Sequence, residues 1–385
     1  MSNLSEKRSG GKLGIRKGIF LLLIFYSYLP ALAQVDTAWV RRFNGSGNAG
    51  DEAYSLAVDN SGNVYVTGFS TGSGTLQDYL TLKYSPNGDT LWVRSYNGPG
   101  NGNDVANALV LDDSGNVYVT GFSDKDTTTA INYDYLTIKY SPNGDSLWTR
   151  RYNGPGNSGD RALALAVDDS GNVYVTGFSV AIGTSDYTTI KYSPKGDTLW
   201  VRRYNGPGNR YDFAYAIAVD NSHNVYVTGL SIGSGTQDDY ATIKYSPIGD
   251  TLWVRRYNGP GNTFDDAYAL VLDNSGNVYV TGFSVGSGSL DDYATIKYSP
   301  NGDSLWVRRY NGTGSDGDEA FAIAVDGSGN TYVTGYSDSD TSLRTNRDYV
   351  TIKYGSNGDT SWVRRYDGIG RGNDEAYALA LDDSG

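Results

Sequence analysis

The sequence of 385 residues has no cysteine, a single histidine and a single methionine, which is the initiator. Without cysteine, disulfides, zinc-thiolate sites and cysteine nucleophiles are excluded. The lone His223 does not support a histidine-ligated metal site, and a Ser-His-Asp triad would have to be built around this one residue. Carboxylates are therefore the main candidates for polar chemistry in this chain.

Residues 1–33 have the pattern of a secretory signal peptide. Five basic residues precede an apolar run from Ile19 to Leu29, and Ala31-Leu32-Ala33 offers a cleavage site of small residues. The run is shorter than the roughly 18 residues that a membrane span needs, so we expect export with cleavage rather than a membrane anchor. We therefore expect a secreted or cell-surface protein whose folded domain spans 34–385.

Acidic residues outnumber basic ones by 43 to 31, which gives a net charge of −12. Loss of the signal peptide would make the mature chain more acidic still, because that segment is basic. Such a charge repels nucleic acid and anionic membranes. It either keeps an exported protein soluble or attracts cations and basic partners.

An internal repeat dominates the sequence. All seven tryptophans lie in one motif, typified by Gly-Asp-Thr-Leu-Trp-Val-Arg, at spacings of 52 to 56 residues. A period near 50 residues is typical of a propeller blade. The tryptophans are Trp39, Trp92, Trp148, Trp200, Trp253, Trp306 and Trp362.

Each repeat contains four strand-like runs, which in the first copy are 53–59, 63–70, 78–85 and 90–96. Short connections rich in Asn, Ser and Gly predict hairpins between the first and second runs and between the third and fourth. The sequence thus predicts an all-β fold, a β-propeller of four-stranded antiparallel blades.

Six complete blades extend from residue 53 to 366, with an orphan fourth strand around Trp39 and an orphan first strand at 376–382. We expect these two pieces to belong to a seventh blade of a truncated ring. By comparison with the other copies, 22 to 26 further residues would complete it.

All length variation lies between the second and third strands of each repeat, where the loops have 7, 10, 6, 7, 7 and 10 residues. In an up-and-down blade these loops share a rim with the connections between repeats. Variable loops on a rigid scaffold are the usual place for binding.

The segment 58–68 is Val-Asp-Asn-Ser-Gly-Asn-Val-Tyr-Val-Thr-Gly, and its Asn-Val-Tyr-Val-Thr-Gly core recurs at 116–121, 172–177, 224–229 and 277–282, and at 330–335 with Thr331 as the one change. This core resembles the bacterial β-propeller repeat family called SBBP, and the resemblance covers essentially all of 37–385. It implies an exported or surface protein, a seven-bladed propeller and no shared catalytic activity.

Several repeated residues invite a functional interpretation. The tryptophans are best explained by packing between blades, each with an Arg two residues later on the same strand face. An Asp also precedes every first strand, and this ring suggests a cation or basic-ligand site at the mouth of the channel, or else local turns or partners for strand arginines. The ring consists of Asp51, Asp104, Asp160, Asp212, Asp265, Asp318 and Asp374.

The ten-residue loops are the most individual segments. In 338–347, Asp338, Asp340 and Arg344 form the best candidate for a specific binding site. Alternating acids in the two loops, Asp124 with Asp126 and Asp338 with Asp340, offer oxygen ligands for calcium but lack the Gly and closing Glu of a complete calcium loop. Apart from this weak calcium signal, no cofactor is indicated.

The histidine replaces the Gly of the turn between first and second strands, where we expect it to tolerate a left-handed backbone. No catalytic constellation is evident. We expect a binding or structural module whose partner is an extracellular protein or carbohydrate. The alternative is a carbohydrate-active enzyme that uses rim carboxylates.

Overall fold

The computed structural model describes residues 37–125, 132–181, 183–314, 317–338, 347–368 and 372–382. Contacts divide the chain into Met1–Ala38 and Trp39–Gly385, and every described strand belongs to the second unit. The predicted signal peptide at 1–33 lies outside the described residues. Within the described ranges there is no helix with the length and apolar character of a membrane crossing.

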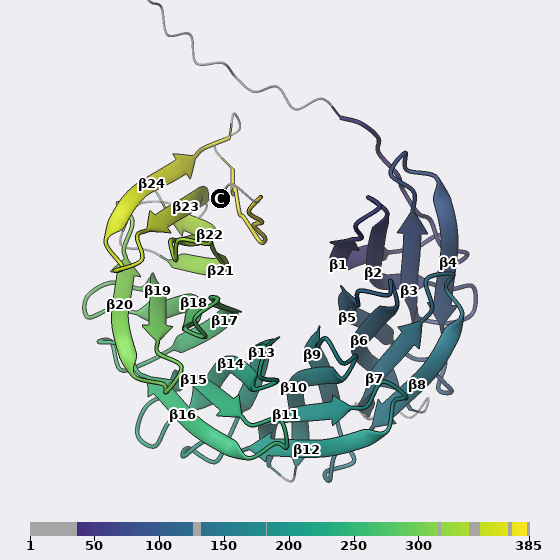
Figure 1. Cartoon of the computed structure of the whole chain (residues 1–385), viewed down its shortest axis with the longest axis horizontal. Coiled ribbons are helices and arrows are strands. Elements are labelled where there is room, and N and C mark those ends of the chain that lie inside the picture. Colours follow the sequence, from purple (N-terminus) through teal and green to yellow (C-terminus); the bar gives the residue numbers. More distant parts are fainter. Residues whose placement is uncertain are drawn as a thin grey trace, which may run out of the picture. The chain divides into compact units, whose positions relative to one another are not determined.

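Six antiparallel sheets of four consecutive strands make up the described part of the second unit. Figure 1 shows them following one another around an axis, with the first strand of each sheet innermost and the fourth outermost. This arrangement confirms the predicted β-propeller of four-stranded blades, here numbered one to six.

The strands are β1 (Asp51–Val58), β2 (Val64–Thr71), β3 (Gln77–Tyr84) and β4 (Thr90–Tyr96); β5 (Asp104–Leu111), β6 (Val117–Asp124), β7 (Tyr133–Tyr140) and β8 (Ser146–Tyr152); β9 (Asp160–Val167), β10 (Val173–Ala181), β11 (Thr184–Tyr192) and β12 (Thr198–Tyr204); β13 (Asp212–Val219), β14 (Val225–Ile232), β15 (Asp238–Tyr245) and β16 (Thr251–Tyr257); β17 (Asp265–Leu272), β18 (Val278–Val285), β19 (Asp291–Tyr298) and β20 (Ser304–Tyr310); and β21 (Asp318–Val325), β22 (Thr331–Asp338), β23 (Arg347–Tyr354) and β24 (Thr360–Tyr366).

The predicted strands of the first copy agree with β1 to β4 to within two residues. β1 begins at Asp51 rather than at the predicted residue 53, because Asp51 pairs with Ser70 in the ladder to β2. The predicted hairpins are also present. Gly62 and Gly88 have φ of 78° and 81°, a backbone that favours glycine, and their amides donate to the carbonyls of Asp59 and Ser85.

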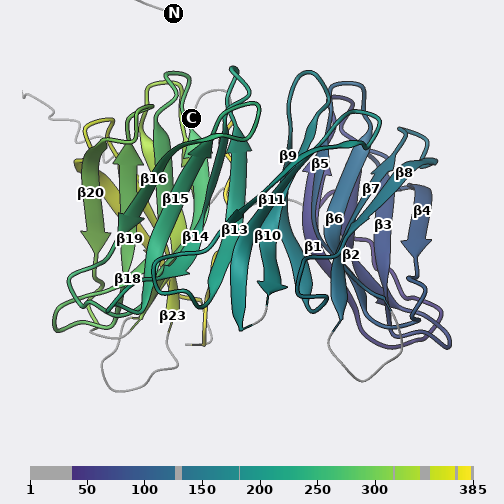
Figure 2. The same cartoon turned by 90° about the horizontal axis from the view of Figure 1, so that it is seen from below.

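The strands run between two rims, as the side view in Figure 2 shows. The connections between blades lie beside the ends of the second strands: the Gly208 amide donates to the Ile232 carbonyl, and the Gly261 amide to the Val285 carbonyl, each over 3.0 Å. We call this side the crossover rim. The opposite side, which carries the turns between first and second strands, is the turn rim.

The hydrophobic core lies between neighbouring blades. Between blades one and two, Tyr65 and Trp92 of the first pack against Val119, Leu136 and Ile138 of the second. These three aliphatic side chains are at most 1% exposed. Alternation along β2 and β3 supplies one face to each neighbour, so every blade is stabilised by the next.

The tryptophans join adjacent blades. The Trp92 indole nitrogen donates to the Pro142 carbonyl of the next blade over 3.1 Å, and the Trp92 ring lies 6.2 Å from that of Tyr140. Two residues on, the Arg94 guanidinium lies 5.7 Å from the Trp92 ring centre and donates to the Gly144 carbonyl. Both contacts recur along the chain, so the tryptophans pack between neighbouring blades, as the sequence predicts.

The two orphan strands of the sequence prediction are not paired in any sheet. Residues 37–45 and 372–382 carry no strand and belong to none of the six described sheets. The face of blade one that points away from blade two is more exposed than the same face of blade two. Leu56 is 67% exposed, whereas the equivalent Leu109 of blade two, which packs on blade one, is 8% exposed. Residues 372–382 lie between the two end blades, where Tyr377 stacks on Phe321 of β21, and 378–380 line a pocket with 53–56 of β1.

Candidate functional site

The predicted ring of aspartates holds the connections between blades. Each of the seven carboxylates accepts a hydrogen bond of 2.6 to 3.0 Å from the amide of the glycine six residues before it. Five of the seven are fully buried, which corrects the view that they line the mouth of an open channel. Their hydrogen bonds to nearby backbone amides agree with the alternative interpretation, that these aspartates stabilise local turns. The five buried residues are Asp104, Asp160, Asp212, Asp265 and Asp318.

The arginines of the fourth strands pair with a different set of carboxylates. Arg151 contacts Asp134 at 3.0 Å, and Arg256 contacts Asp239 at 2.7 Å, so the partner is the Asp of the Asp-Tyr pair near the start of the third strand of the same blade. These pairs are partly buried and recur in blades two to six. They are part of the scaffold.

Two of the predicted loop acids lie at strand ends. Asp338 ends β22 and is only 5% exposed, and Asp124 ends β6, where its carboxylate accepts from the Asn103 amide over 2.7 Å. Asp126, Asp340 and Arg344 lie outside the described residues. The structure therefore shows a backbone-holding role for Asp124 and leaves the binding hypothesis for 338–347 as a prediction.

The structure reveals a carboxylate group that the sequence interpretation missed. Asp266 on β17 and Glu319 on β21 each follow a buried ring aspartate, and Asp238 and Asp291 open β15 and β19. All four are partly buried and belong to the crossover-rim ends of blades four to six. We call Asp238, Asp266, Asp291 and Glu319 the acidic cluster.

Burial, and then repulsion between neighbouring carboxylates, raises the pKa values of Asp238, Asp266 and Asp291. The pKa of Asp266 rises to about 8, first because burial disfavours the charged carboxylate and then because Asp238 and Glu319 are close. Asp265 and Asp291 add to the same rise. At neutral pH, Asp266 therefore keeps its proton.

The pKa of Asp291 rises to about 6, from burial and then from Glu319 and Asp292, while the charge of Arg347 opposes the rise. The pKa of Asp238 is also raised, first by burial. At neutral pH the cluster thus combines a protonated Asp266 with a largely ionised Asp291.

A row of aromatic rings runs along the innermost strands of the same blades. Ring centres lie 5.6 Å apart for Tyr215 and Tyr268, 5.5 Å for Tyr268 and Phe321, and 5.1 Å for Phe321 and Tyr377. Tyr268 lies at a β-bulge between Ala267 and Ala269, and the charges of Asp266 and Glu319 add to the effect of burial in raising the pKa of its hydroxyl. Acidic groups and aromatic surface therefore occur together.

One cation flanks the cluster. The Arg347 guanidinium lies 4.0 Å from the ring centre of Tyr336, whose hydroxyl donates to Glu319. Arg347 also forms an ion pair with Glu375 at 2.7 Å. This arrangement places a positive charge at one end of an otherwise acidic surface.

A signal for this cluster was present in the sequence. The residue after the ring aspartate varies among the seven copies, so the repeat does not require an acid at this position. The seven are Glu52, Val105, Arg161, Phe213, Asp266, Glu319 and Glu375. The position before the Asp-Tyr pair of the third strand varies equally, as Gln77, Tyr133, Ser185, Asp238, Asp291 and Arg347.

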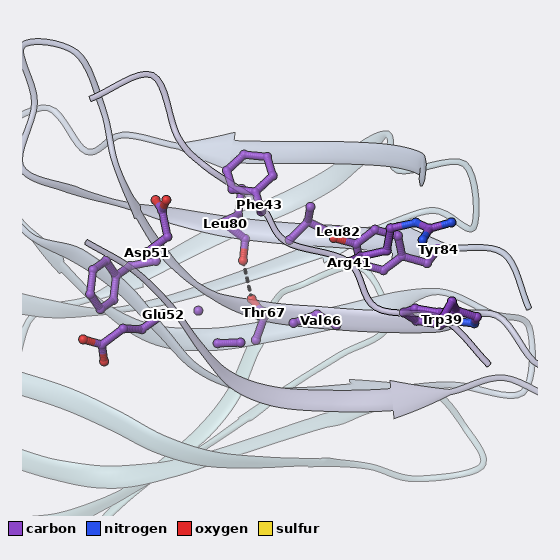
Figure 3. A pocket seen from close by; sticks show the side chains of 13 residues that line it. Trp39, Arg41, Phe43, Asp51, Glu52, Val66, Thr67, Leu80, Leu82 and Tyr84 are labelled. Carbon is purple, nitrogen blue, oxygen red and sulfur yellow. Dashed lines mark hydrogen bonds between the residues drawn. The ribbon is translucent and has the colours of Figure 1, made fainter. Parts of the chain in front are cut away.

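A pocket of about 230 Å³ lies between Trp39–Phe43 and the first sheet (Figure 3). Its apolar wall includes Val66, Leu80 and Leu82, which correspond to the core residues Val119, Leu136 and Ile138 of blade two. In blade two, Tyr65 and Tyr79 of the preceding blade pack on those residues. The pocket is therefore an unfilled part of the packing between blades, with the geometry to receive side chains of a preceding blade.

Comparison with known proteins agrees with this fold. Residues 38–74, 199–235 and 305–340 match the family model of the SBBP β-propeller repeat, so the chain carries repeats of this family at these three places. The uncharacterized WD repeat-containing protein L264 of Acanthamoeba polyphaga mimivirus is 25% identical over 382 residues, which cover 81% of this chain and 26% of that protein. The chain thus spans about a quarter of the length of this relative.

Among solved structures, Sqt1 from Chaetomium thermophilum superposes with a TM-score of 0.53 at 9% identity, covering 83% of this chain and 73% of that one. The polysaccharide lyase Uly1 gives a TM-score of 0.47 at 12% identity, covering 88% and 86%. The likeness to Sqt1 concerns the fold alone, and the likeness to Uly1 carries no argument about substrate.

Proposed function

We propose that this chain is an exported propeller that binds an extracellular partner through the crossover rim of blades four to six. The acidic cluster is the observation that carries the proposal. Its four carboxyl groups come from four strands, at positions where the repeat does not require an acid. Burying them together costs stability, and perturbed carboxyl groups of this kind concentrate at functional sites.

The chemistry of the site favours a partner with exposed positive charge, such as a basic segment of a protein. The carboxylates attract cations, and the row of Tyr215, Tyr268 and Phe321 offers aromatic surface beside them. The basic, apolar pattern of 1–33 supports export to the compartment where such a partner would be met.

Binding of hexalysine and of a neutral oligosaccharide, measured by isothermal titration calorimetry at low salt, tests this proposal. We expect hexalysine to bind the wild type, and Asp266→Asn with Glu319→Gln to weaken binding at least about tenfold. Asp113→Asn is the matched control, because Asp113 is exposed on the turn rim and other copies have Asn there. Equal binding by all three proteins would exclude the acidic cluster as the site.

The second candidate is a carbohydrate-active enzyme, and one observation favours it. Asp266, with its pKa near 8, retains a proton that it could donate, while the neighbouring Asp291, with a pKa near 6, is mostly ionised. Such a split is what a general acid and a carboxylate partner require. Release of reducing ends from a panel of polysaccharides by the wild type, and its loss in Asp266→Asn, would support this function over simple binding.

A further inference from the structure

The single histidine lies against two aspartates of the neighbouring blade on the turn rim. His223 is in the turn between β13 and β14, and Asp168 and Asp169 are in the turn between β9 and β10. The distance from His223 Nδ1 to Asp168 Oδ2 is 3.1 Å, and from Nε2 to Asp169 Oδ1 it is 3.7 Å. One ligand atom from each of the three residues lies within 4.8 Å of the others.

The backbone at His223 does not explain the choice of histidine. Its φ is 60°, and the corresponding residues of the other described turns are glycines with φ between 76° and 79°. Every other described residue with positive φ that is not glycine is asparagine, which tolerates this conformation with a smaller side chain. An imidazole adds a nitrogen ligand that the turn itself does not need.

The two aspartates differ in how firmly they are held. Asp168 is 9% exposed, and its carboxylate accepts hydrogen bonds of 2.8 Å from the side chains of Asn172 and Tyr174. The side chain of Asp169 is 74% exposed and accepts a hydrogen bond of 3.2 Å from the Ser170 hydroxyl, and its position is occupied by Asn in three other copies. The site thus has one fixed carboxylate, one adjustable carboxylate and one imidazole.

We propose that Asp168, Asp169 and His223 bind a divalent transition metal ion of the zinc class. Imidazole and carboxylate ligands suit zinc, and three protein ligands with an open fourth position are a common arrangement for it. Hydrogen bonds such as those from Asn172 and Tyr174 orient carboxylate ligands in metal sites. A bound ion would connect blade three to blade four.

Titration of the full chain with ZnCl₂, in competition with a chromogenic chelator, tests the proposal. We expect one equivalent to bind the wild type, and affinity to fall at least about tenfold in His223→Gly and in Asp169→Asn. Both substitutions introduce the residue that other copies carry at the same position, so folding is preserved. Zinc binding unchanged in His223→Gly, or no binding to the wild type up to about millimolar zinc, would overturn the proposal.

A gain of binding gives an independent test. Gly171 of blade three faces Asp112 and Asp113 of blade two as His223 faces Asp168 and Asp169. Gly171→His should therefore bind a second equivalent of zinc, and zinc should raise the thermal midpoint of the wild type but not that of His223→Gly. A folded Gly171→His protein that binds only one equivalent would contradict the geometry on which the proposal rests.

Discussion

The hydroxyl of Tyr79 in blade one donates a hydrogen bond to the carbonyl of Leu136 in blade two over 3.0 Å. Tyr79 is 1% exposed, and the same bond recurs at each of the next four junctions, with distances of 3.0 to 3.2 Å. A hydroxyl buried this deeply needs an acceptor, and the next blade supplies it. The blades are therefore joined by specific polar contacts as well as by apolar packing.

Replacing Tyr79 by Phe should lower the free energy of unfolding by about 1 kcal/mol, because one buried hydrogen bond is lost at almost constant volume. Tyr349 is the matched control. It is the equivalent residue of blade six, is 37% exposed, and should tolerate Phe with a change below about 0.5 kcal/mol. Urea unfolding followed by fluorescence measures both, and equal effects would contradict a role for the bond between blades.

Two tryptophans offer a second matched pair. Trp253 donates to the Pro300 carbonyl over 3.1 Å, whereas the buried Trp306 indole nitrogen has no hydrogen-bond partner among the described residues. In the last copy Ser356 stands in place of the proline, and its carbonyl accepts from Lys297 as the Pro300 carbonyl accepts from Lys244. Both tryptophans are 8% exposed.

Changing either tryptophan to Phe removes similar volume, so the packing loss should be alike. Trp253→Phe should then be the more destabilising by about 1 kcal/mol, since it alone loses a hydrogen bond. Thermal unfolding of the two variants measures this difference. A larger loss for Trp306→Phe would contradict the proposed contribution of the indole bond.

The raised pKa of Asp266 makes stability depend on pH. The folded protein keeps this proton up to about pH 8, whereas the unfolded chain releases it near the usual value of 3.8, so wild-type stability falls as the pH rises between these values. Asp266→Asn removes this effect. The stability of the variant relative to the wild type should rise by at most about 1.4 kcal/mol per pH unit and level off above pH 8.

Unfolding at pH 5, 6, 7 and 8 measures that trend, with Asp113→Asn as a control whose difference from the wild type should stay flat. The groups that surround Asp266, namely Asp238, Asp265, Asp291 and Glu319, are present in both proteins. A constant difference between Asp266→Asn and the wild type would show that Asp266 is ionised across this range.

The exposed face of blade one predicts that a hairpin of second- and third-strand sequence can pack against it. Leu56, Leu80 and Leu82 of blade one correspond to Leu109, Leu136 and Ile138 of blade two, which pack against Tyr65 and Tyr79. A synthetic peptide copying residues 63–85, added to the protein, should raise its thermal midpoint. The same peptide with Ser in place of the tyrosines that correspond to Tyr65 and Tyr79 should not raise the thermal midpoint. Equal shifts with the two peptides would contradict the packing model.

The fold could be predicted almost completely from the sequence because the same pattern of four strands and two tight turns occurs in every complete copy of the repeat. The predicted fourth strand at 90–96 coincides with β4, and the turns at Gly62 and Gly88 were expected from their composition. Strands were also expected around Trp39 and at 376–382, but these described residues carry none. Local pattern cannot report whether a partner strand is in place.

The candidate sites could be predicted much less well. Asp238, Asp266, Asp291 and Glu319 lie on four strands of three blades, and only the stacking of the blades brings them together. The variable residue after each ring aspartate was the available signal. His223 was correctly expected to adopt a left-handed backbone, but its approach to Asp168 depends on how one blade packs on another.

The most direct test of the central claim, that a cation-bearing partner binds at the acidic cluster, is the number of protons released when hexalysine binds at pH 7. Calorimetry in two buffers of different ionisation enthalpy measures that number. Because Asp266, with a pKa near 8, is protonated at pH 7 and a bound cation favours its ionised form, the account predicts release of close to one proton by the wild type and almost none by Asp266→Asn. Binding of equal strength without proton release in both proteins would contradict the claim and place the site elsewhere.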